Sequence, residues 1–316
     1  MANRNNENAV TVLPKRHEGS LKRRKIIGNT AVYAILIIIC VVWMIPFVCI
    51  LFQSFNVDWM YDANGVRIAD DLLKRGGPIV GYVIPAHFGF DNYINLFTKS
   101  NFGKWYLNTF IISLFTAAIQ TIMVMTMSYT LSRLRFKGRK FLMNFMLVLG
   151  MFPGFLTMII LYFILRDLGM TGSGAMWGLI LVYTASSGMG YYVCKGFFDT
   201  IPKSLDEAAR IDGATRLQVM TRVILPLSKP IVIYTVLTAF MGPWGDFMFA
   251  KYIAFGSDPN YNVAVGLQMF LTQDQIPYSY TLFCAGGVLV AIPVTILFMC
   301  LQRYYVEGVT GGAVKG

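Results

Sequence analysis

The sequence predicts an all-α membrane protein with six transmembrane helices, and its composition and the placement of its charges are the two observations behind this prediction. Of the 316 residues, 56% are hydrophobic and only 14% are charged, and the mean hydropathy is +0.56. Soluble domains carry about 25% charged residues. A helix that crosses a bilayer needs about 20 mostly apolar residues, so the long apolar runs define the expected spans.

Six such runs follow one another along the chain. Five contain windows without any Asp, Glu, Lys or Arg, and the remaining window, Pro230–Ala250, holds a single charged residue, Asp246. We therefore expect spans at about 26–55, 105–132, 141–165, 172–195, 230–252 and 278–303. The segments around them are a basic tail (1–25), an outer segment (56–104), a polar loop (199–229) and a C-terminal tail (304–316).

Positively charged side chains orient these spans. The chain has 27 lysines and arginines, and 20 of them lie in the two tails, in the loop after the second span or in the loop after the fourth. Because such residues concentrate on the cytoplasmic side, both termini are predicted to be cytoplasmic and 56–104 to lie outside. This distribution accounts for the net charge of +11, so we expect a protein of the lipid bilayer with no nucleic-acid partner.

Cysteine and histidine do not form a metal-binding pattern in this sequence. The five cysteines lie in the spans or at their ends, no C-x-x-C pair occurs, and the two histidines are His17 and His87. Metal sites and disulfide frameworks are built from closely spaced residues of these types. No nucleophile–base pair shares a span either. We therefore expect no metal site and no catalytic residue, which disfavours a membrane-embedded enzyme.

Three expectations concern local structure. Pro153 is expected to kink the third span, because a proline removes a backbone hydrogen bond. Gly242-Pro243 is expected to break the fifth span for the same reason. The outer segment is expected to contain a short amphipathic helix on the outer face, formed around apolar residues at helical spacing: Phe90, Tyr93, Ile94 and Phe97.

The polar loop carries signals for two short helices joined at a glycine. Ser204 and Glu207 match an S-x-x-E capping box, and Thr215 and Gln218 match a second box, in which side chains and backbone amides bond reciprocally at a helix start. Gly213 lies between the two boxes and is expected to end the first helix. The segment is therefore predicted to be a helix–turn–helix on the cytoplasmic side.

The first of these helices could contact a partner. Asp206 and Arg210 are spaced for an ion pair at i, i+4, and one face is expected to carry Leu205, Ala208, Ala209 and Asp212. Small side chains on an exposed helix let another surface come close. On charge pattern alone, a solvated linker is an equally good interpretation.

The spacing within the loop resembles a known signature. Glu207-Ala208-Ala209, three residues, Gly213, nine residues, Val223, one residue and Leu225-Pro226 match the EAA signature of ABC-importer permeases, with Val223 for the usual isoleucine. In that family the loop docks as a coupling helix on an ATP-hydrolysing subunit. The resemblance implies an ABC permease domain over 26–303 and these ATPase-coupling residues: Leu205, Asp206, Glu207, Ala208, Ala209, Arg210, Asp212 and Gly213.

The ATPase is expected to be a separate chain. No G-x-x-x-x-G-K-[ST] phosphate loop occurs in the sequence, and the backbone amides and lysine of that loop are what bind nucleotide phosphates. ATP and Mg²⁺ would therefore be used by a partner ATPase dimer, and this chain would carry no cofactor.

Further segments resemble the carbohydrate-uptake permeases, and the maltose/maltodextrin branch in particular. The segments are DNYINLF (91–97), WYLNTF (105–110), SRLRFKGRK (132–140), GPWGDFMFA (242–250) and VEGVTGGAVKG (306–316). Relatives usually have Asn where Gly245 stands, so any polar role of that side chain is absent. The resemblance implies import of oligosaccharides across the bacterial cytoplasmic (inner) membrane, with a second homologous permease and an extracytoplasmic sugar-binding protein as partners.

Candidate substrate-pathway residues lie in the fourth and fifth spans. Asp246 is an acid inside a span, and such acids often mark a pathway; it could equally cap amides freed beside Gly242-Pro243. Sugars are typically held by aromatic faces, which could be supplied by Tyr183, Tyr191, Tyr192 and Trp244. Aromatic residues in spans more often pack or face lipid.

Two transport functions compete with maltodextrin import. An ABC permease for a different sugar would share all of these motifs. An ion-coupled secondary transporter would leave the EAA spacing unexplained and would usually show paired intramembrane charges or inverted repeats, whereas Asp246 is the one charged residue within the six apolar windows. The sequence therefore favours an ABC importer permease.

Overall fold

The computed structural model describes residues 18–61, 66–67, 84–186, 188–256, 258–272 and 279–313. The chain divides into two compact units, 1–49 and 50–316, which we describe separately. Most of the predicted N-terminal tail and the last three residues of the C-terminal tail lie outside the described residues.

The described residues are helical apart from turns, loops and two isolated β-bridges, so the predicted all-α class is confirmed. The longer helices are α1 (Glu18–Ser54), α2 (Asp91–Thr98), α3 (Phe102–Arg133), α4 (Arg139–Gly150), α5 (Gly154–Asp167), α6 (Ala175–Ala185), α7 (Gly188–Asp199), α8 (Lys203–Ile211), α11 (Lys229–Gly245), α13 (Val263–Thr272) and α14 (Ser279–Ala313). The shorter ones are η1 (Asp58–Met60), η3 (Gly172–Gly174), α9 (Arg216–Gln218), the π-helical η4 (Val219–Ile224), α10 (Leu225–Leu227), α12 (Met248–Ile253) and η5 (Asp258–Asn260).

Helix α1 forms the first unit and leads into the second. Residues 26–54 have the length and hydropathy of a membrane span, and the side chains of 26–48 are all exposed in this chain. A helix that is apolar on every side belongs in lipid or within an assembly rather than in water. The residues of the predicted first span therefore lie in one continuous helix.

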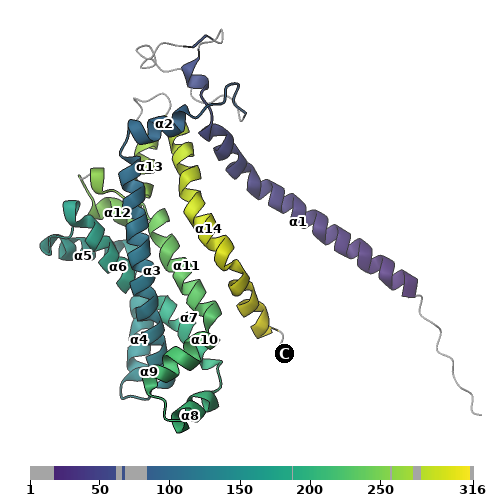
Figure 1. The fold of residues 1–316 in the computed structure, drawn as a ribbon, viewed down its shortest axis with the longest axis vertical. Helices are drawn as coiled ribbons and strands as arrows, with labels where there is room; N and C mark the ends of the chain where they lie inside the picture. The colour runs from purple at the N-terminus through teal and green to yellow at the C-terminus, as the bar shows by residue number, and fades with distance from the viewer. Residues whose placement is uncertain are drawn as a thin grey trace, which may run out of the picture. The chain divides into compact units, whose positions relative to one another are not determined.

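In the second unit, α3 is the centre of the helix packing. It lies beside α11, α7 and α6, while α14 packs against α11, α13 and α2 (Figure 1). Buried positions on α3 include small hydroxyl side chains, namely Thr109, Ser113, Thr116 and Ser128. Small residues let helices approach closely in membrane proteins, which explains how one helix can contact several others.

The helices bend sharply at two breaks, one within the predicted third span and one between the polar loop and the predicted fifth span. Helices α4 and α5 meet at 100° beside Pro153, as the expected kink required, and the helical segment Arg216–Leu227 meets α11 at 86°. The expected break at Gly242-Pro243 is wrong, because α11 continues through Pro243 to Gly245. The break falls at Asp246, where Asn262 Nδ2 donates to the carbonyls of Pro243 (3.1 Å) and Asp246 (2.7 Å). The helix therefore ends where another side chain satisfies its free carbonyls.

Three helices among the described residues are long and apolar enough to cross a membrane, namely Ile26–Ser54, Phe102–Arg133 and Ser279–Gln302. Counting each bent pair as one span raises the number to five. The predicted fourth span is divided between α6 and α7, so neither half has the length of a crossing helix.

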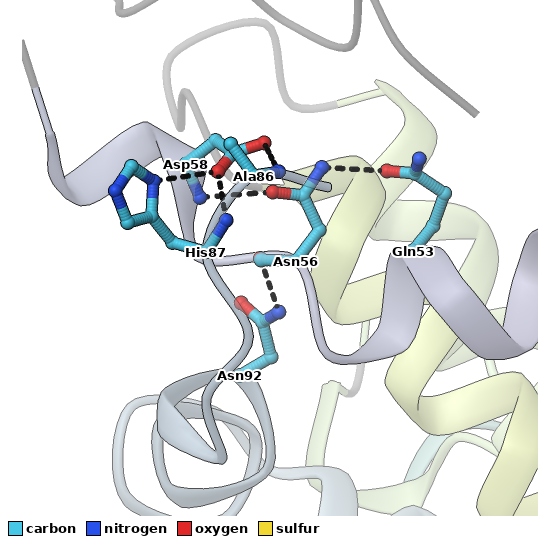
Figure 2. A network of polar contacts seen from close by, with 6 residues as sticks. All are labelled: Gln53, Asn56, Asp58, Ala86, His87 and Asn92. Atoms are coloured by element: carbon cyan, nitrogen blue, oxygen red, sulfur yellow. Dashed lines mark hydrogen bonds and ion pairs between the residues drawn. The ribbon is translucent and has the colours of Figure 1, made fainter. Parts of the chain in front are cut away.

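A polar network holds the start of the second unit together at the end where α2 lies (Figure 2). The carboxylate of Asp58 accepts two backbone N–H bonds, at 3.0 and 2.7 Å, and lies 2.9 Å from Nδ1 of His87. The amide of Asn92 donates to the carbonyls of Ser54 and Asn56, at 3.1 and 2.7 Å. The chain that follows α1 is thus tied to α2.

The expected short helix around 90–97 is present as α2, and its packing is the reverse of a soluble amphipathic helix. Asn92, Asn95 and Leu96 are buried, whereas Phe90, Ile94 and Phe97 are more than half exposed. The buried side-chain oxygen of Asn92 has hydrogen-bond partners, because it accepts from Trp59 Nε1 (3.1 Å) and Thr281 Oγ1 (3.0 Å). An exposed apolar face on such a helix suits a lipid interface.

Candidate functional site

The polar loop folds as two short helices, as predicted, but the first one begins differently. Helix α8 starts at Lys203 after Pro202, whose ψ of 131° is not helical, and no side chain caps it. The expected cap by Ser204 is therefore wrong. Because the helix starts before Ser204, this hydroxyl sits inside the first turn and cannot take the cap position.

The turn between the two helices matches its prediction. Gly213 has φ +84°, a left-handed conformation that glycine adopts without steric cost. Thr215 then caps α9: its Oγ1 accepts from the N–H of Gln218 at 3.3 Å, and its own N–H donates to Gln218 Oε1 at 2.8 Å. Local sequence rules thus set this turn correctly.

Apolar side chains around this turn are exposed. No residue of α8 is buried; Ile211 is 87% exposed and Leu217, in α9, is 67% exposed. On the inner side, Ala209 and Ala214 pack against a buried apolar cluster that includes Phe198. Large apolar groups exposed together on a polar segment mark an interaction surface. We call this surface, Leu205 to Leu217, the coupling surface, after the role that the sequence resemblance implies for it.

A buried arginine joins α8 to α3. The side chain of Arg133, the last residue of α3, is 3% exposed, and its Nε lies 3.1 Å from Oδ2 of Asp206, whose side chain is 14% exposed. Nη2 of Arg133 also donates to the carbonyl of Ile201 at 2.9 Å. The expected partner of Asp206 was Arg210, so this prediction is corrected: the carboxylate turns towards the membrane domain.

A second carboxylate lies beside this contact. Oδ1 of Asp199 accepts from Ser132 Oγ at 2.6 Å, and Oδ2 accepts from Lys195 Nζ at 2.5 Å. Burial tends to raise the pKa of Asp199, but hydrogen bonds from Lys195 and Ser132 outweigh it and lower this pKa. Burial raises the pKa of Asp206, against the opposing charge of Arg133. The two carboxyl groups are therefore shifted in opposite directions.

Sequence reasoning missed the role of Arg133. The basic segment 132–140 predicts the orientation of the spans and resembles the carbohydrate-uptake permeases, but neither observation predicts a contact between Arg133 and α8. The available signal was the location of Arg133 as the first charge after a long apolar span, where the side chain can turn back against neighbouring helices.

The candidate pathway residues separate into two groups. Tyr183 and Asp246 meet: the tyrosine hydroxyl donates to Oδ2 of Asp246 at 2.5 Å, and Oδ1 accepts from the N–H of Phe249 at 3.1 Å. Asp246 thus bonds to an amide in the first turn of α12, and not to amides freed beside Gly242-Pro243 as the sequence analysis had left open. The same carboxylate still reaches the tyrosine.

The other three aromatic candidates are packed elsewhere. Tyr191 is 9% exposed and Trp244 is 5% exposed; the indole stands edge-on to Tyr106, with ring centroids 5.2 Å apart. The hydroxyl of Tyr192 donates to the carbonyl of Met143. These contacts are typical of packing, the alternative that the sequence had favoured for aromatic residues in spans.

The end of α3 near α2 is fixed to the segment after α12. Trp105 Nε1 donates to the carbonyl of Asp258 at 2.8 Å, and Asn108 Nδ2 donates to the carbonyls of Pro259 and Tyr261 at 3.0 and 3.1 Å. Nearby, a side chain at Gly266 would meet the ring of Trp105, which lies 2.0 Å from the Cβ position. This end is closely packed as well as hydrogen-bonded.

Among the described residues, no group of three or more His, Cys, Asp or Glu is arranged to hold a metal ion. The structure therefore offers two candidate regions: the coupling surface with its anchors, and the contact between Tyr183 and Asp246.

Comparison with known proteins identifies similar chains. A family model described as "Binding-protein-dependent transport system inner membrane component" matches residues 124–311. The galactooligosaccharides transport system permease protein of Bacillus subtilis is 41% identical over 238 residues, covering 74% of this chain and 83% of that protein. The maltodextrin transport system permease protein of Streptococcus pneumoniae is 40% identical over 230 residues, covering 72% and 80%.

A solved structure shares the fold. It is a chain from a bacterial ABC transporter involved in import of the acidic polysaccharide alginate, with a TM-score of 0.70 and 22% identity, covering 90% of this chain and 98% of that one. The region matched by the family model, 124–311, includes the polar loop, Arg133 and both candidate pathway residues in contact.

Proposed function

This chain belongs to the family of binding-protein-dependent transport system inner membrane components, and we propose that it couples to a partner ATPase through the loop 199–229 while it passes a maltodextrin-type oligosaccharide. It is a permease subunit of an ABC importer and a multi-pass membrane protein, that is, a transport component and not an enzyme. The proposal concerns its topology, its coupling contact, its partners and its sugar.

In the proposed topology six crossings put both termini and the coupling surface in the cytoplasm, with 56–104 outside. The crossings are α1, α3, the α4–α5 pair, the α6–α7 pair, α11 and α14. Support comes from the placement of 20 of the 27 basic residues, because basic loops stay cytoplasmic. Reporter fusions at Gly76 and Gly138 test this topology, and the same compartment for both would contradict it.

The exposure of Ile211 and Leu217 on either side of the Gly213 turn is the observation that carries the coupling proposal. Exposed apolar groups there lower their free energy by docking into a partner. We expect Ile211→Asp to reduce the amount of ATPase subunit that co-purifies with the permease. The control is Phe136→Asp, which alters an exposed apolar residue in the other basic loop. Equal retention of the ATPase by both variants would contradict the proposed contact.

The proposed complex contains an ATPase dimer, a second homologous permease and an extracytoplasmic sugar-binding protein. The family description itself specifies dependence on a binding protein. A pair of permeases is proposed because a single chain leaves the apolar surface of α1 and of α4 exposed. Copurification from co-expressed neighbouring genes, followed by subunit counting in native mass spectrometry, tests the composition.

The proposed substrate is a neutral maltodextrin, and a galacto-oligosaccharide is the second candidate because a relative of similar identity carries that name. Within the predicted spans, Tyr183 and Asp246 supply a hydroxyl and a carboxylate, group types that hydrogen-bond sugar hydroxyls. The complex in proteoliposomes should show greater ATPase stimulation with binding protein and maltotriose than with a galacto-oligosaccharide. Greater ATPase stimulation by the galacto-oligosaccharide would contradict maltodextrin as the substrate and support the second candidate.

Variants of the polar contact test the pathway itself. Tyr183→Phe removes one hydroxyl while keeping the ring, and we expect slower sugar transport with normal insertion. Tyr192→Phe is the matched control, because its hydroxyl bonds to the carbonyl of Met143 within the helix packing. Equal transport in the two variants would remove Tyr183 from the pathway.

A further inference from the structure

Helix α3 contacts the polar loop on both sides of the Gly213 turn. Arg133 reaches α8 through Asp206, and one turn earlier in α3 the hydroxyl of Tyr129 donates to the carbonyl of Arg216 in α9 at 3.3 Å. Because α3 is also the helix against which α6, α7 and α11 pack, a displacement of α8 has a direct route into the packed bundle. The chain itself joins α8 to α7 on one side and, through α9, η4 and α10, to α11 on the other.

The ion pair between Arg133 and Asp206 leaves hydrogen-bonding atoms of both side chains unused. The ion pair joins one nitrogen to one oxygen, and this contact lacks the angles of a hydrogen bond; Nη1 of Arg133 and Oδ1 of Asp206 are buried and have no hydrogen-bond partner among the described residues. A guanidinium and a carboxylate can form two parallel hydrogen bonds. Neither bond is formed in this arrangement, and a small rotation of α8 towards α3 would allow both.

Because the pair is buried, the number of hydrogen bonds between Arg133 and Asp206 has a large effect on its energy. At 3% exposure the guanidinium cannot replace a lost partner with water, and buried charged groups left without partners are costly. The charges near Asp206 are Arg133, Glu207 and Lys203, and the last two lie on α8 itself. Only Arg133 among them connects α8 to another element.

We infer that Arg133 and Asp206 form a latch that closes from a one-point to a two-point contact when α8 is moved by the ATPase, and that this closure transmits the movement to α3. Arg133 is therefore a positioning residue for coupling. The inference rests on the proposed docking of the ATPase at the coupling surface, and it adds which helix receives the motion and through which atoms.

The decisive variants keep the charges and change the geometry. Arg133→Lys retains a buried cation that can make one-point contacts but not a two-point fork. Asp206→Glu retains a carboxylate that can accept both bonds. In the complex with ATPase and binding protein, we expect Arg133→Lys to lower the sugar transported per ATP hydrolysed about tenfold, within the range typical of coupling between sites. Asp206→Glu should keep at least half of it.

Assembly is measured in the same preparations. Both variants should retain the ATPase subunit on co-purification, because Arg133 and Asp206 face each other and the exposed apolar side chains of the coupling surface, Ile211 and Leu217, are unchanged. The control is Arg135→Lys, the same replacement at an exposed position in the same loop, which should behave as the wild type.

The outcomes separate this inference from the proposed docking. Normal coupling in Arg133→Lys overturns the latch and leaves the docking intact. Loss of the ATPase subunit in Arg133→Lys also overturns it, because Arg133 would then merely support the fold of the loop. Retention of the ATPase by Ile211→Asp contradicts the docking, whatever Arg133→Lys does. The latch is supported if Arg133→Lys retains the ATPase but loses coupling, while Asp206→Glu keeps its coupling.

Discussion

The two ends of α3 are fixed by different chemistry. At the end near α2, neutral side chains such as Trp105 and Asn108 donate to backbone carbonyls of 258–261. At the other end charged groups take part: Arg133 pairs with Asp206 of α8, and Ser132 donates to the carboxylate of Asp199 in α7, beside bonds from Tyr129 and Arg133 to backbone carbonyls. Bonds to backbone carbonyls hold one geometry, whereas the pair with Asp206 has unused atoms on both partners.

This difference indicates a rigid end and a movable end on one helix. Local packing points the same way, since the Trp105 ring leaves no room for a side chain at Gly266, while a side chain at Gly213 would meet nothing within 4 Å. Variants at matched positions should therefore affect stability at the α2 end and coupling at the α8 end.

The largest effect is expected from Gly213→Val. Valine at φ +84° carries strain of about 1–2 kcal/mol, so the turn should rearrange and displace α8 from its docking geometry. We expect sugar transport to be abolished while the protein still inserts in the membrane, as measured by uptake of labelled sugar and by membrane fractionation.

The control for this variant is another left-handed glycine. Gly138 has φ +88° and open space around it, so Gly138→Val carries similar strain in the other basic loop without touching the coupling surface. Full transport by Gly213→Val, or an equal loss in both variants, would show that the two ends do not differ as described.

The next effect concerns stability at the α2 end. In Gly266→Ala the new methyl would overlap the ring of Trp105, and overpacking of this kind costs about 1–3 kcal/mol. We expect a lower midpoint of thermal unfolding in detergent. Gly242→Ala, with nothing within 4 Å of its Cβ position, should keep or raise the midpoint, and equal midpoints for both variants would contradict the close packing.

A smaller effect is expected from Asn262→Ala. This amide is 1% exposed and bonds to the carbonyls of Pro243 and Asp246, so its loss leaves buried acceptors unsatisfied, at about 1–3 kcal/mol. The matched variant is Asn108→Ala, whose bonds lie closer to the surface and should be worth about 1 kcal/mol. Equal unfolding midpoints for the two would argue against a buried fixed end.

Local features of this site were predictable from the sequence. The Gly213 turn and the cap by Thr215 follow from rules that span a few residues, and both are confirmed. The cap by Ser204 failed because Pro202 moves the helix start by two residues. A short-range rule succeeds only where no neighbouring residue offers a competing start.

Long-range contacts were not predictable from one sequence. Spacing alone assigned Asp206 to Arg210, whereas the packing of α8 on the bundle assigns it to Arg133. Composition likewise could not distinguish an aromatic residue in a cavity from one in the core, and Trp244 packs in the core. The helical class was recoverable because the length of the apolar runs is a property of the chain itself.

The smallest expected effect is a pH dependence confined to the movable end. Burial raises the pKa of Asp206, whereas the bonds from Lys195 and Ser132 lower the pKa of Asp199. As the pH falls, Asp206 is protonated first, above the usual range of an aspartate, and its ion pair with Arg133 weakens while Asp199 stays charged. Stability should not fall in this window, because a raised pKa means that the folded state takes up the proton more readily than the unfolded state; the stability that Asp199 contributes is lost only at still lower pH.

Coupling should therefore decline on mild acidification before the unfolding midpoint falls. The measurement is sugar transported per ATP against the pH on the ATPase side of proteoliposomes, alongside thermal unfolding at each pH. Asp206→Asn should start with weak coupling and lose this pH dependence, because it cannot titrate. If coupling in Asp206→Asn still declines with pH as it does in the wild type, the titrating group is not Asp206.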